Sequence, residues 1–239
     1  MRATSMRAPS MLRTITVAIV LTIAAALPAV AQQVGGGVTI FIPEATWLSQ
    51  GTVSYEAQFG TSIGLGGLFS VPVGIAYDKV DGLLPNGTGI SQRSLPWAVT
   101  DSFMLSAGLK LTIPVSIMFL EAEGGGVLQW NAGVLPLDGN IAATLAPAGT
   151  IWAWKSVDAS APFGYGYYAG GAIGVNIKGV RLTLKGGYRY TLSPLTLSGS
   201  YYQTDTGNVT TSGPTTLNKT DASLRLAGVY VGITGSVGF

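Results

Sequence analysis

The residues that could do chemistry are ionisable side chains set at even spacings within otherwise apolar segments. Arg181, Lys185 and Arg189 lie four positions apart, and they therefore share one face of an extended chain, in which successive side chains alternate. Buried charges must be paired or solvated. We therefore expect an ion-pair network inside the fold. Its predicted members are Glu56, Lys110, Glu121, Glu123, Arg181, Lys185 and Arg189.

The same inventory argues against catalysis. The chain has no His and no Cys, although His is the commonest base for a hydroxyl nucleophile and both residues are the usual zinc ligands. Asp78, Asp81 and Asp101 come near the ends of apolar segments, where we expect solvated charges at a loop rim. The sequence predicts no enzyme, no cofactor, and no catalytic or metal site.

The first 31 residues have the pattern of a secretory signal peptide. Arg2, Arg7 and Arg13 precede an apolar run from Ile15 to Leu27, and small residues follow at Ala29–Ala31. A basic region, a short apolar region and a small-residue cleavage site define such peptides. The apolar run is too short to span a bilayer comfortably. We predict a signal peptide at 1–31 and one mature domain at 32–239.

The mature composition indicates a membrane protein without spanning helices. Residues 32–239 carry ten basic and eleven acidic side chains, a balance that does not suggest nucleic acid as a partner. The mean hydropathy of the chain is +0.42 and only 10% of its residues are charged, yet no apolar run after Leu27 is long enough for a spanning helix. In lipid the alternative is a closed sheet. The predicted fold is an all-β, antiparallel transmembrane β-barrel with membrane lipids as partners.

Period-two alternation locates the strands. In Val180–Leu192 the apolar side chains fall on one face and the cations on the other. Phe163–Ile177 alternates in the same way, and a tight turn at 178–179 would place Tyr168 opposite Arg189 with both faces in register. The joined pair reads as a β-hairpin.

Further alternating segments bring the total to about eight strands, a common number for bacterial barrels. A total of ten strands is the alternative, because Leu195–Thr204 and Val209–Leu217 could pair as another hairpin of the barrel. The same hairpin could instead extend above the membrane. The remaining predicted strands are Val34–Ile42, Val53–Leu65, Phe69–Val80, Asp101–Ile113, Val115–Trp130 and the C-terminal segment.

Connection lengths alternate between short and long, as in outer-membrane barrels, whose short turns face the periplasm. The predicted short turns are Gly66–Gly67, Ile113–Pro114 and Lys178–Gly179. The predicted long connections are Pro43–Thr52, Asp81–Thr100, Asn131–Pro162 and Ser193–Asp221. Trp152 and Trp154 lie in one of these loops, either as part of an aromatic belt, or packed on the rim, or exposed as a recognition patch.

Two glutamates decide the orientation of one strand. A carboxylate facing lipid near mid-depth costs roughly a few kcal/mol, so we expect Glu121 and Glu123 to face inward. That choice turns Val115 and Ile117 inward as well. A bulge at 124–126 would relieve the conflict.

The last strand ends in an alternating apolar pattern that includes Val231, Ile233, Val237 and Phe239. It resembles the C-terminal assembly signal of Gram-negative outer-membrane barrels, which implies that the barrel assembly machinery recognises Val237 and Phe239. Gly235 departs from the pattern, since a larger apolar residue is usual there. The chain is similar to the small eight-stranded barrels that include the OmpA transmembrane domain, OmpX and OmpW, and its first strand, "GGGVTIFIP", favours OmpW.

An interior of eight strands holds only side chains or one small ligand. The OmpW resemblance implies an outer-membrane location and a porin-like narrow gated path, or a pocket, for a small apolar or small polar ligand. The alternatives are a filled structural barrel and an adhesin that acts at the cell surface through its loops. The oligomeric state is left open. Small inward positions would leave room opposite the cations: Gly164, Gly166, Gly170, Ala172, Gly174 and Gly232.

Overall fold

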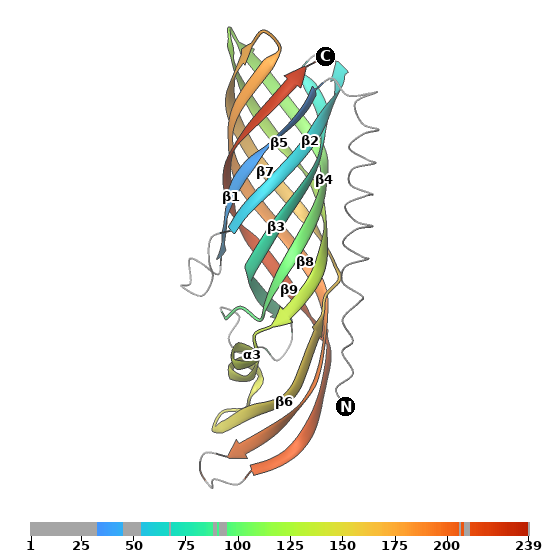
Figure 1. Cartoon of the computed structure of the whole chain (residues 1–239), viewed down its shortest axis with the longest axis vertical. Coiled ribbons are helices and arrows are strands. Elements are labelled where there is room, and N and C mark those ends of the chain that lie inside the picture. Colours follow the sequence, from blue (N-terminus) through green and yellow to red (C-terminus); the bar gives the residue numbers. More distant parts are fainter. Residues whose placement is uncertain are drawn as a thin grey trace, which may run out of the picture.

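The fold is seen in a computed structural model (Figure 1). The predicted signal peptide and Phe239 lie outside the residues that it describes. Within the described part, the only helix is α3 (Asp138–Leu145), and no helix there is long and apolar enough to cross a membrane. The described residues are 33–44, 54–66, 68–87, 90, 95–205, 207 and 211–238.

Strands make up nearly all of the described chain. Several of them are longer than the alternation alone predicts, because the pairing continues into segments expected to be loops. Their bounds are β1 (Gln33–Pro43), β2 (Ser54–Gly66), β3 (Phe69–Gly87), β4 (Ala98–Val115), β5 (Met118–Pro136), β6 (Thr150–Ser160), β7 (Phe163–Ile177), β8 (Val180–Asp205) and β9 (Thr211–Gly238).

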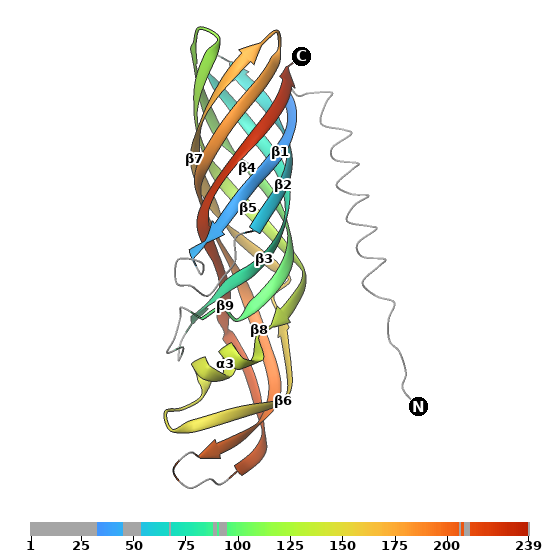
Figure 2. The same cartoon turned by 60° about the vertical axis from the view of Figure 1, so that its left-hand side comes forward.

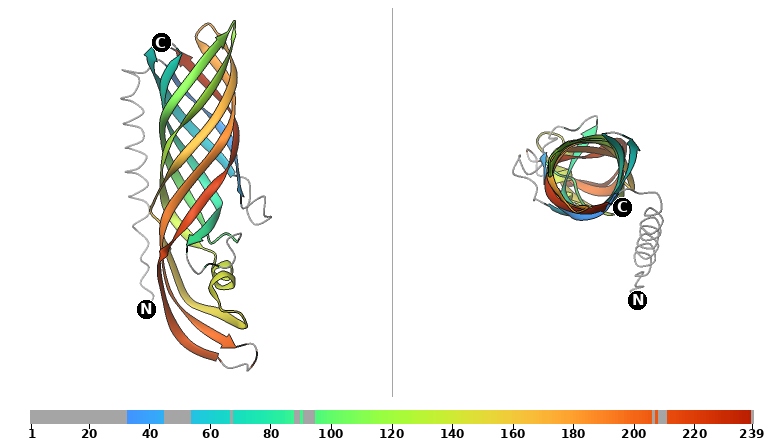
Figure 3. Two further views of the ribbon diagram at one scale, coloured as in Figure 1. Left: turned by 180° about the vertical axis from the view of Figure 1, so that it is seen from behind. Right: turned by 90° about the horizontal axis from the view of Figure 1, so that it is seen from above.

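Eight of these strands form a closed antiparallel ring in the order β1, β2, β3, β4, β5, β7, β8, β9 (Figure 3). The ring closes where β9 pairs with β1, from Gln33 opposite Gly238 to Pro43 opposite Gly228. Closure leaves no open sheet edge in the ring. The predicted eight-stranded all-β barrel is confirmed, and so is the hairpin register that sets Tyr168 opposite Arg189.

The outer surface of the ring is apolar, as the alternation predicts. A surface of this kind is far larger than the apolar patches of soluble monomers. It is the face that an outer-membrane barrel presents to lipid. Its more exposed side chains include Val38, Ile40, Leu105, Leu109, Ile113, Leu120, Leu128, Ile173, Leu182, Leu184, Val231, Ile233 and Val237.

The two ends of the barrel differ. We call the end with the short turns, such as 178–179, the turn end, and the opposite end the loop end. Outward aromatic side chains gather toward the loop end, where Tyr77 and Phe103 have ring centroids 5.1 Å apart and Tyr167 and Tyr190 stack at 5.4 Å. Aromatic girdles of this kind mark the edge of the apolar band in transmembrane barrels.

The hairpin of β4 and β5 corrects two predictions. Its turn is at Ser116–Ile117, where Ser116 has a φ of 60°, and Val115 pairs with Met118. The predicted turn at 113–114 is therefore wrong. Val115 instead continues the outward face of β4, and the conflict that required a bulge at 124–126 disappears, since the pairing is continuous there.

Beyond the ring, β8 and β9 continue as a paired ribbon, and β6 adds to the free side of β8 (Figures 1 and 2). We call this three-stranded sheet the extension. The hairpin that would have raised the count to ten barrel strands lies in this extension and not in the ring. The predicted long connections at 131–162 and 193–221 therefore contain regular structure, while 45–53 lies outside the described residues.

A hydrophobic core fills the loop end of the barrel. Here β3 runs past the ends of β1 and β2 and pairs directly with β9, with Leu84 opposite Arg225. The indole of Trp97 donates a hydrogen bond to Thr144 Oγ1 of α3 at 3.2 Å. We call this group the loop-end core. Its most deeply buried members are Phe41, Leu83, Trp97, Ala98, Ile141, Ala161, Leu195, Leu197, Leu224 and Leu226.

The apolar band allows a direct test of lipid contact. Leu184 is 52% exposed and lies midway along the apolar part of β8, whereas Ile177 lies beside the turn end. Arginine at the bilayer midplane costs about 2–4 kcal/mol and near the interface about 0–1 kcal/mol. We expect Leu184→Arg to lower the free energy of unfolding in phospholipid bilayers by the larger amount and Ile177→Arg by the smaller. Equal losses of unfolding free energy for the two variants in a urea titration would contradict contact of this band with lipid.

Candidate functional site

The candidate site is the polar interior of the ring, which we call the lumen. The inward faces of β2, β4, β5 and β8 bring all seven predicted ionisable residues into it, because each lies on the polar face of its alternating strand. They do not form one network. They form separate groups at successive levels between the turn end and the loop end.

At the turn end, Glu121 is the centre of an ion cluster. Its Oε1 lies 3.4 Å from Lys110 Nζ and 3.1 Å from Arg181 Nη2. Arg181 also donates to Gln33 Oε1 at 2.9 Å, and its guanidinium lies 3.7 Å from the centroid of the Phe119 ring. The three charged side chains are about 10% exposed. We call this group the neck cluster.

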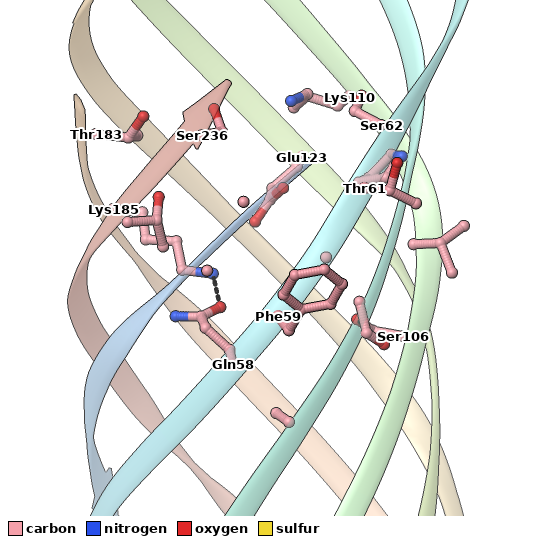
Figure 4. A pocket seen from close by; sticks show the side chains of 18 of the residues that line it. Gln58, Phe59, Thr61, Ser62, Ser106, Lys110, Glu123, Thr183, Lys185 and Ser236 are labelled. Carbon is pink, nitrogen blue, oxygen red and sulfur yellow. Dashed lines mark hydrogen bonds between the residues drawn. The ribbon is translucent and has the colours of Figure 1, made fainter. Parts of the chain in front are cut away.

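In the middle of the lumen, Lys185 donates to Gln58 Oε1 (Figure 4, dashed line). The other end of that amide, Gln58 Nε2, is buried and has no hydrogen-bond partner within the described residues. Glu123 points into the same space (Figure 4) and forms neither a hydrogen bond nor an ion pair with the part of the chain that the structure describes. The Lys185 ammonium and the Glu123 carboxylate therefore both line this space, and the Gln58 amide beside Lys185 has donors without a partner among the described residues.

Nearer the loop end, Arg189 links two carboxylates. Its Nη1 donates to Glu56 Oε2, and its Nη2 lies 3.6 Å from Asp78 Oδ2. Thr39 Oγ1 donates to Glu56 at 3.2 Å, and the Phe41 ring lies under the guanidinium with its centroid 4.3 Å away. A bidentate-capable guanidinium is suited to holding carboxylates away from water.

Asp78 is a lumen residue that the sequence analysis placed wrongly at the loop rim. Its side chain is fully buried beside Arg189. The signal was present, because Gly74, Ala76 and Asp78 continue the inward face of β3. The alternation predicts a strand that ends at Val80 with solvated aspartates near its end, whereas the strand continues to Gly87.

Between Arg189 and the loop-end core, neutral polar side chains of β4, β5 and β8 form a hydrogen-bonded group in the lumen. Asn131 accepts from Gln129 Nε2 and from Ser102 Oγ, both at 2.8 Å, and donates to the carbonyl of Ala161 at 2.6 Å. Thr191 donates to Gln129 Oε1. The sequence does not distinguish these residues, since neutral polar side chains carry no distinctive spacing. Together with the loop-end core they occupy this end of the lumen.

The charges within the ring balance. The described lumen holds four cations and four carboxylates, one carboxylate more than the sequence analysis assigned, because Asp78 joins the set. Burying an ion costs several kcal/mol unless it is paired and hydrogen-bonded, so balance is the condition for placing eight charges here. Within the described residues, no group of three or more His, Cys, Asp or Glu could hold a metal ion.

The small inward positions are largely covered rather than hollow. A Cβ atom added at Gly170 or Gly187 would collide with the Tyr230 hydroxyl, and one added at Gly174 would collide with the Phe119 ring. These glycines therefore make room for aromatic side chains. The predicted hollow along this wall is wrong at Gly170 and Gly174.

Two neighbouring spaces in the lumen are lined by residues that the structure describes. A vestibule of about 500 Å³ lies at the turn end, and an inner cavity of about 190 Å³ lies deeper, beside Gln58, Glu123 and Lys185 (Figure 4). Residues of the neck cluster line both spaces, so the cluster lies between them. Four residues are shared by the two linings: Gln33, Ser62, Lys110 and Arg181.

The two predicted loop tryptophans lie on β6 within the extension. The Trp152 ring stacks on Tyr201 at a centroid distance of 3.9 Å, and Trp154 meets both rings edge-on. The Trp154 indole donates to the carbonyl of Asp138 at the start of α3, at 2.9 Å. Both tryptophans are half-buried. The two rings therefore pack within the extension, on Tyr201 and against α3, as the rim-packing alternative predicts. Little of either ring is left to contact a partner.

The predicted assembly signal is only partly within the described residues. Val237 is 47% exposed on the outer face of β9 and pairs with both Val34 and Val180. Phe239 lies outside the described residues. Recognition of Val237 and Phe239 by the assembly machinery stays a prediction.

Comparison with known proteins gives a structural likeness. No protein-family model matches the chain, and no curated protein matches it. Among solved structures, the chain is similar to the crystal structure of a major outer membrane protein from Thermus thermophilus, with 12% sequence identity and a TM-score of 0.39. The match covers 83% of this chain and 98% of that one.

The group around Arg189 can be tested by charge removal. Arg189→Met leaves Glu56 and Asp78 buried without their cation, which should lower the free energy of unfolding by about 3–5 kcal/mol. Adding Glu56→Gln and Asp78→Asn removes the stranded charges and should recover most of that loss. Urea titration in phospholipid vesicles measures both values. A triple variant no more stable than Arg189→Met would contradict the pairing.

Proposed function

We propose that this protein is an integral outer-membrane barrel whose short turns face the periplasm, whose extension stands at the cell surface, and whose lumen is closed to through-flow. The observation that carries the proposal is a closed ring with an apolar outer face and an end filled by the loop-end core. The ring accounts for residence in lipid. The filled end argues against flow of solutes through the barrel.

The orientation rests on the difference between the two ends. The strand pairs end in short turns on one side, as at Ser116–Ile117 and Lys178–Gly179, and extend into α3 and the extension on the other. Outer-membrane barrels keep short turns in the periplasm and long segments outside. The predicted secretion signal and assembly signal are consistent with export and insertion by the barrel assembly machinery.

The lumen supports a pocket rather than a pore. A solute leaving the inner cavity toward the loop end would have to pass Arg189 with its two carboxylates, then the group around Asn131, then the loop-end core. Eight strands leave space for side chains or one small ligand. Of the OmpW-like alternatives, a small-molecule pocket open toward the turn end therefore fits better than a gated path through the barrel.

A role at the cell surface is the second candidate. The extension presents a hydroxyl-rich outer face, in which Ser156 and Ser200 lie 3.0 Å apart and Thr204 and Thr211 lie 3.2 Å apart. A folded sheet held above the membrane suits contact with other surfaces, in an adhesive or structural role. We propose no enzymatic activity and no nucleic-acid partner for either role.

Orientation can be tested by epitope insertion. An epitope at Gly207, in the connection between β8 and β9, should be labelled by antibody on intact cells. The matched insertion at Gly179, in the short turn between β7 and β8, should be labelled only after the outer membrane is permeabilised. Labelling of both sites on intact cells, or of neither after permeabilisation, would overturn the proposed orientation and location.

Closure of the lumen can be tested by electrical recording. The folded protein in planar bilayers should give no steady conductance, because the loop-end core excludes water. Glu121→Gln removes two ion pairs of the neck cluster but leaves that core intact, and it should stay silent as well. Steady current steps in wild-type protein would contradict closure, and steps in Glu121→Gln alone would place the barrier at the turn end.

A further inference from the structure

The inner cavity is larger than isolated buried waters require. A water takes up roughly 30 Å³ of liquid volume, so about 190 Å³ holds about six waters or one small ligand. The cavity lies in the middle of the lumen, between the neck cluster and the Arg189 group. Its wall combines an anion-accepting side, a cation-accepting side and an apolar side.

The anion-accepting side comes from β2 and β8. The Lys185 ammonium has three N–H donors, and Gln58 Oε1 accepts one of them. Gln58 Nε2 adds two donors that are buried and have no partner within the described residues. A carboxylate at this point would receive charge-assisted hydrogen bonds from the ammonium and would satisfy the amide.

The cation-accepting side comes from β5. Glu123 points into the cavity (Figure 4), and among the described residues it has no hydrogen-bonded or ion-paired partner. It shares one row of the sheet with Gly170, Gly187 and Tyr230, in that order across the strands. The two glycines leave room for the Tyr230 hydroxyl, which lies against both of them, and Tyr230 also lines the cavity. A ligand ammonium could therefore reach Glu123 beside an aromatic ring.

The apolar side is a small cluster of buried side chains. Met104, Val127 and Tyr168 pack together there with Ala76, and all four line the cavity. Methionine is unbranched and adapts to irregular shapes. An aliphatic group of a ligand would remove this surface from water, which is favourable.

We infer that the inner cavity binds a small zwitterion, specifically a free α-amino acid with an aliphatic side chain. Its ammonium would pair with Glu123, its carboxylate with Lys185 and Gln58, and its side chain would pack on Met104 and Val127. A ligand with only one charge leaves the opposite residue of the cavity desolvated and unpaired, which is costly. A net-neutral zwitterion also preserves the charge balance of the lumen.

Entry is from the vestibule through the neck cluster. Glu121 holds Lys110 and Arg181 together, so a ligand passes when these side chains move apart. The entry side is the periplasm if the orientation under Proposed function is correct. That assignment rests on the proposed function, whereas binding itself does not.

Calorimetric titration of the folded mature protein in detergent tests the inference. The probes are L-leucine, 4-methylpentanoate, which lacks the ammonium group, and 3-methylbutylamine, which lacks the carboxylate. Loss of a charge-assisted contact weakens binding by about tenfold or more. We expect L-leucine to bind and each analogue to bind at least about tenfold more weakly. Absence of L-leucine binding, or equal affinity for all three compounds, would overturn the inference.

Substitutions separate the two charged sides. Glu123→Gln should weaken L-leucine about tenfold while leaving the weak binding of 4-methylpentanoate unchanged or improved. Lys185→Met should weaken L-leucine similarly and spare 3-methylbutylamine. The matched control is Lys155→Met, since Lys155 is exposed on the extension, and it should bind like wild type. If both lumen variants bind L-leucine normally, the inference fails.

Each variant is first checked for the folded barrel by its heat-sensitive electrophoretic mobility, so that loss of binding is read only in folded protein. Glu123→Gln changes no side-chain volume. Because the titration uses detergent-solubilised protein, its failure would leave the epitope result intact. Failure of the orientation would likewise leave the binding result intact.

Discussion

Everything in this fold depends on pairing the main chain without water. Inside a bilayer each unpaired amide or carbonyl costs several kcal/mol, so the contact between β9 and β1 is what makes the other strand pairs compatible with lipid. That contact runs the full length of β1. It is favoured by the glycine-rich start of β1, because β9 backbone lies so close to Gly35 and Gly37 that a Cβ atom at either position would collide with it. Glycine at positions 35 and 37 is therefore a requirement of this closure.

Closure creates a second constraint inside the ring. Side chains alternate between lipid and lumen, so each spanning strand delivers several residues to a narrow interior, and eight strands leave little space for water around them. The chain meets this constraint in three ways along the axis. Ion pairs occupy the turn end and the level of Arg189, neutral hydrogen bonds follow around Asn131, and apolar packing fills the loop end. The inner cavity is the level where none of these solutions is complete, since Gln58 and Glu123 keep unused polar atoms.

Much of this arrangement follows from alternation alone. The period of two located eight strands, their outward faces and the inward direction of Glu121 and Arg189, because a charge on the lipid face is too costly to occur by accident. What alternation could not locate was where strands end. The segments at 81–87, 131–136 and 193–205 lie beyond the apolar band, so polar and apolar residues no longer alternate clearly in them, yet they belong to strands. For that reason the sequence predicts loops there, with Asp78 at a rim and β6 within a long connection. Which charges pair was also beyond reach, since it depends on stagger between strands that are distant in sequence, as for Arg189 and Glu56.

The loop-end core explains why the same chain can combine a membrane band with a large extension. A barrel that simply stopped at the membrane surface would leave its lumen open to water there, and the long β8 and β9 ribbon would stand alone, although isolated two-stranded ribbons are marginally stable. Here Leu195, Leu197, Leu224 and Leu226 from that ribbon turn into the mouth and pack on Trp97 and Ile141. One set of apolar contacts therefore supports the extension and fills the mouth of the ring. Any motion that opened the barrel at this end would also loosen the extension. Under the proposed closure, exchange with the inner cavity is therefore confined to the end where only ion pairs must separate.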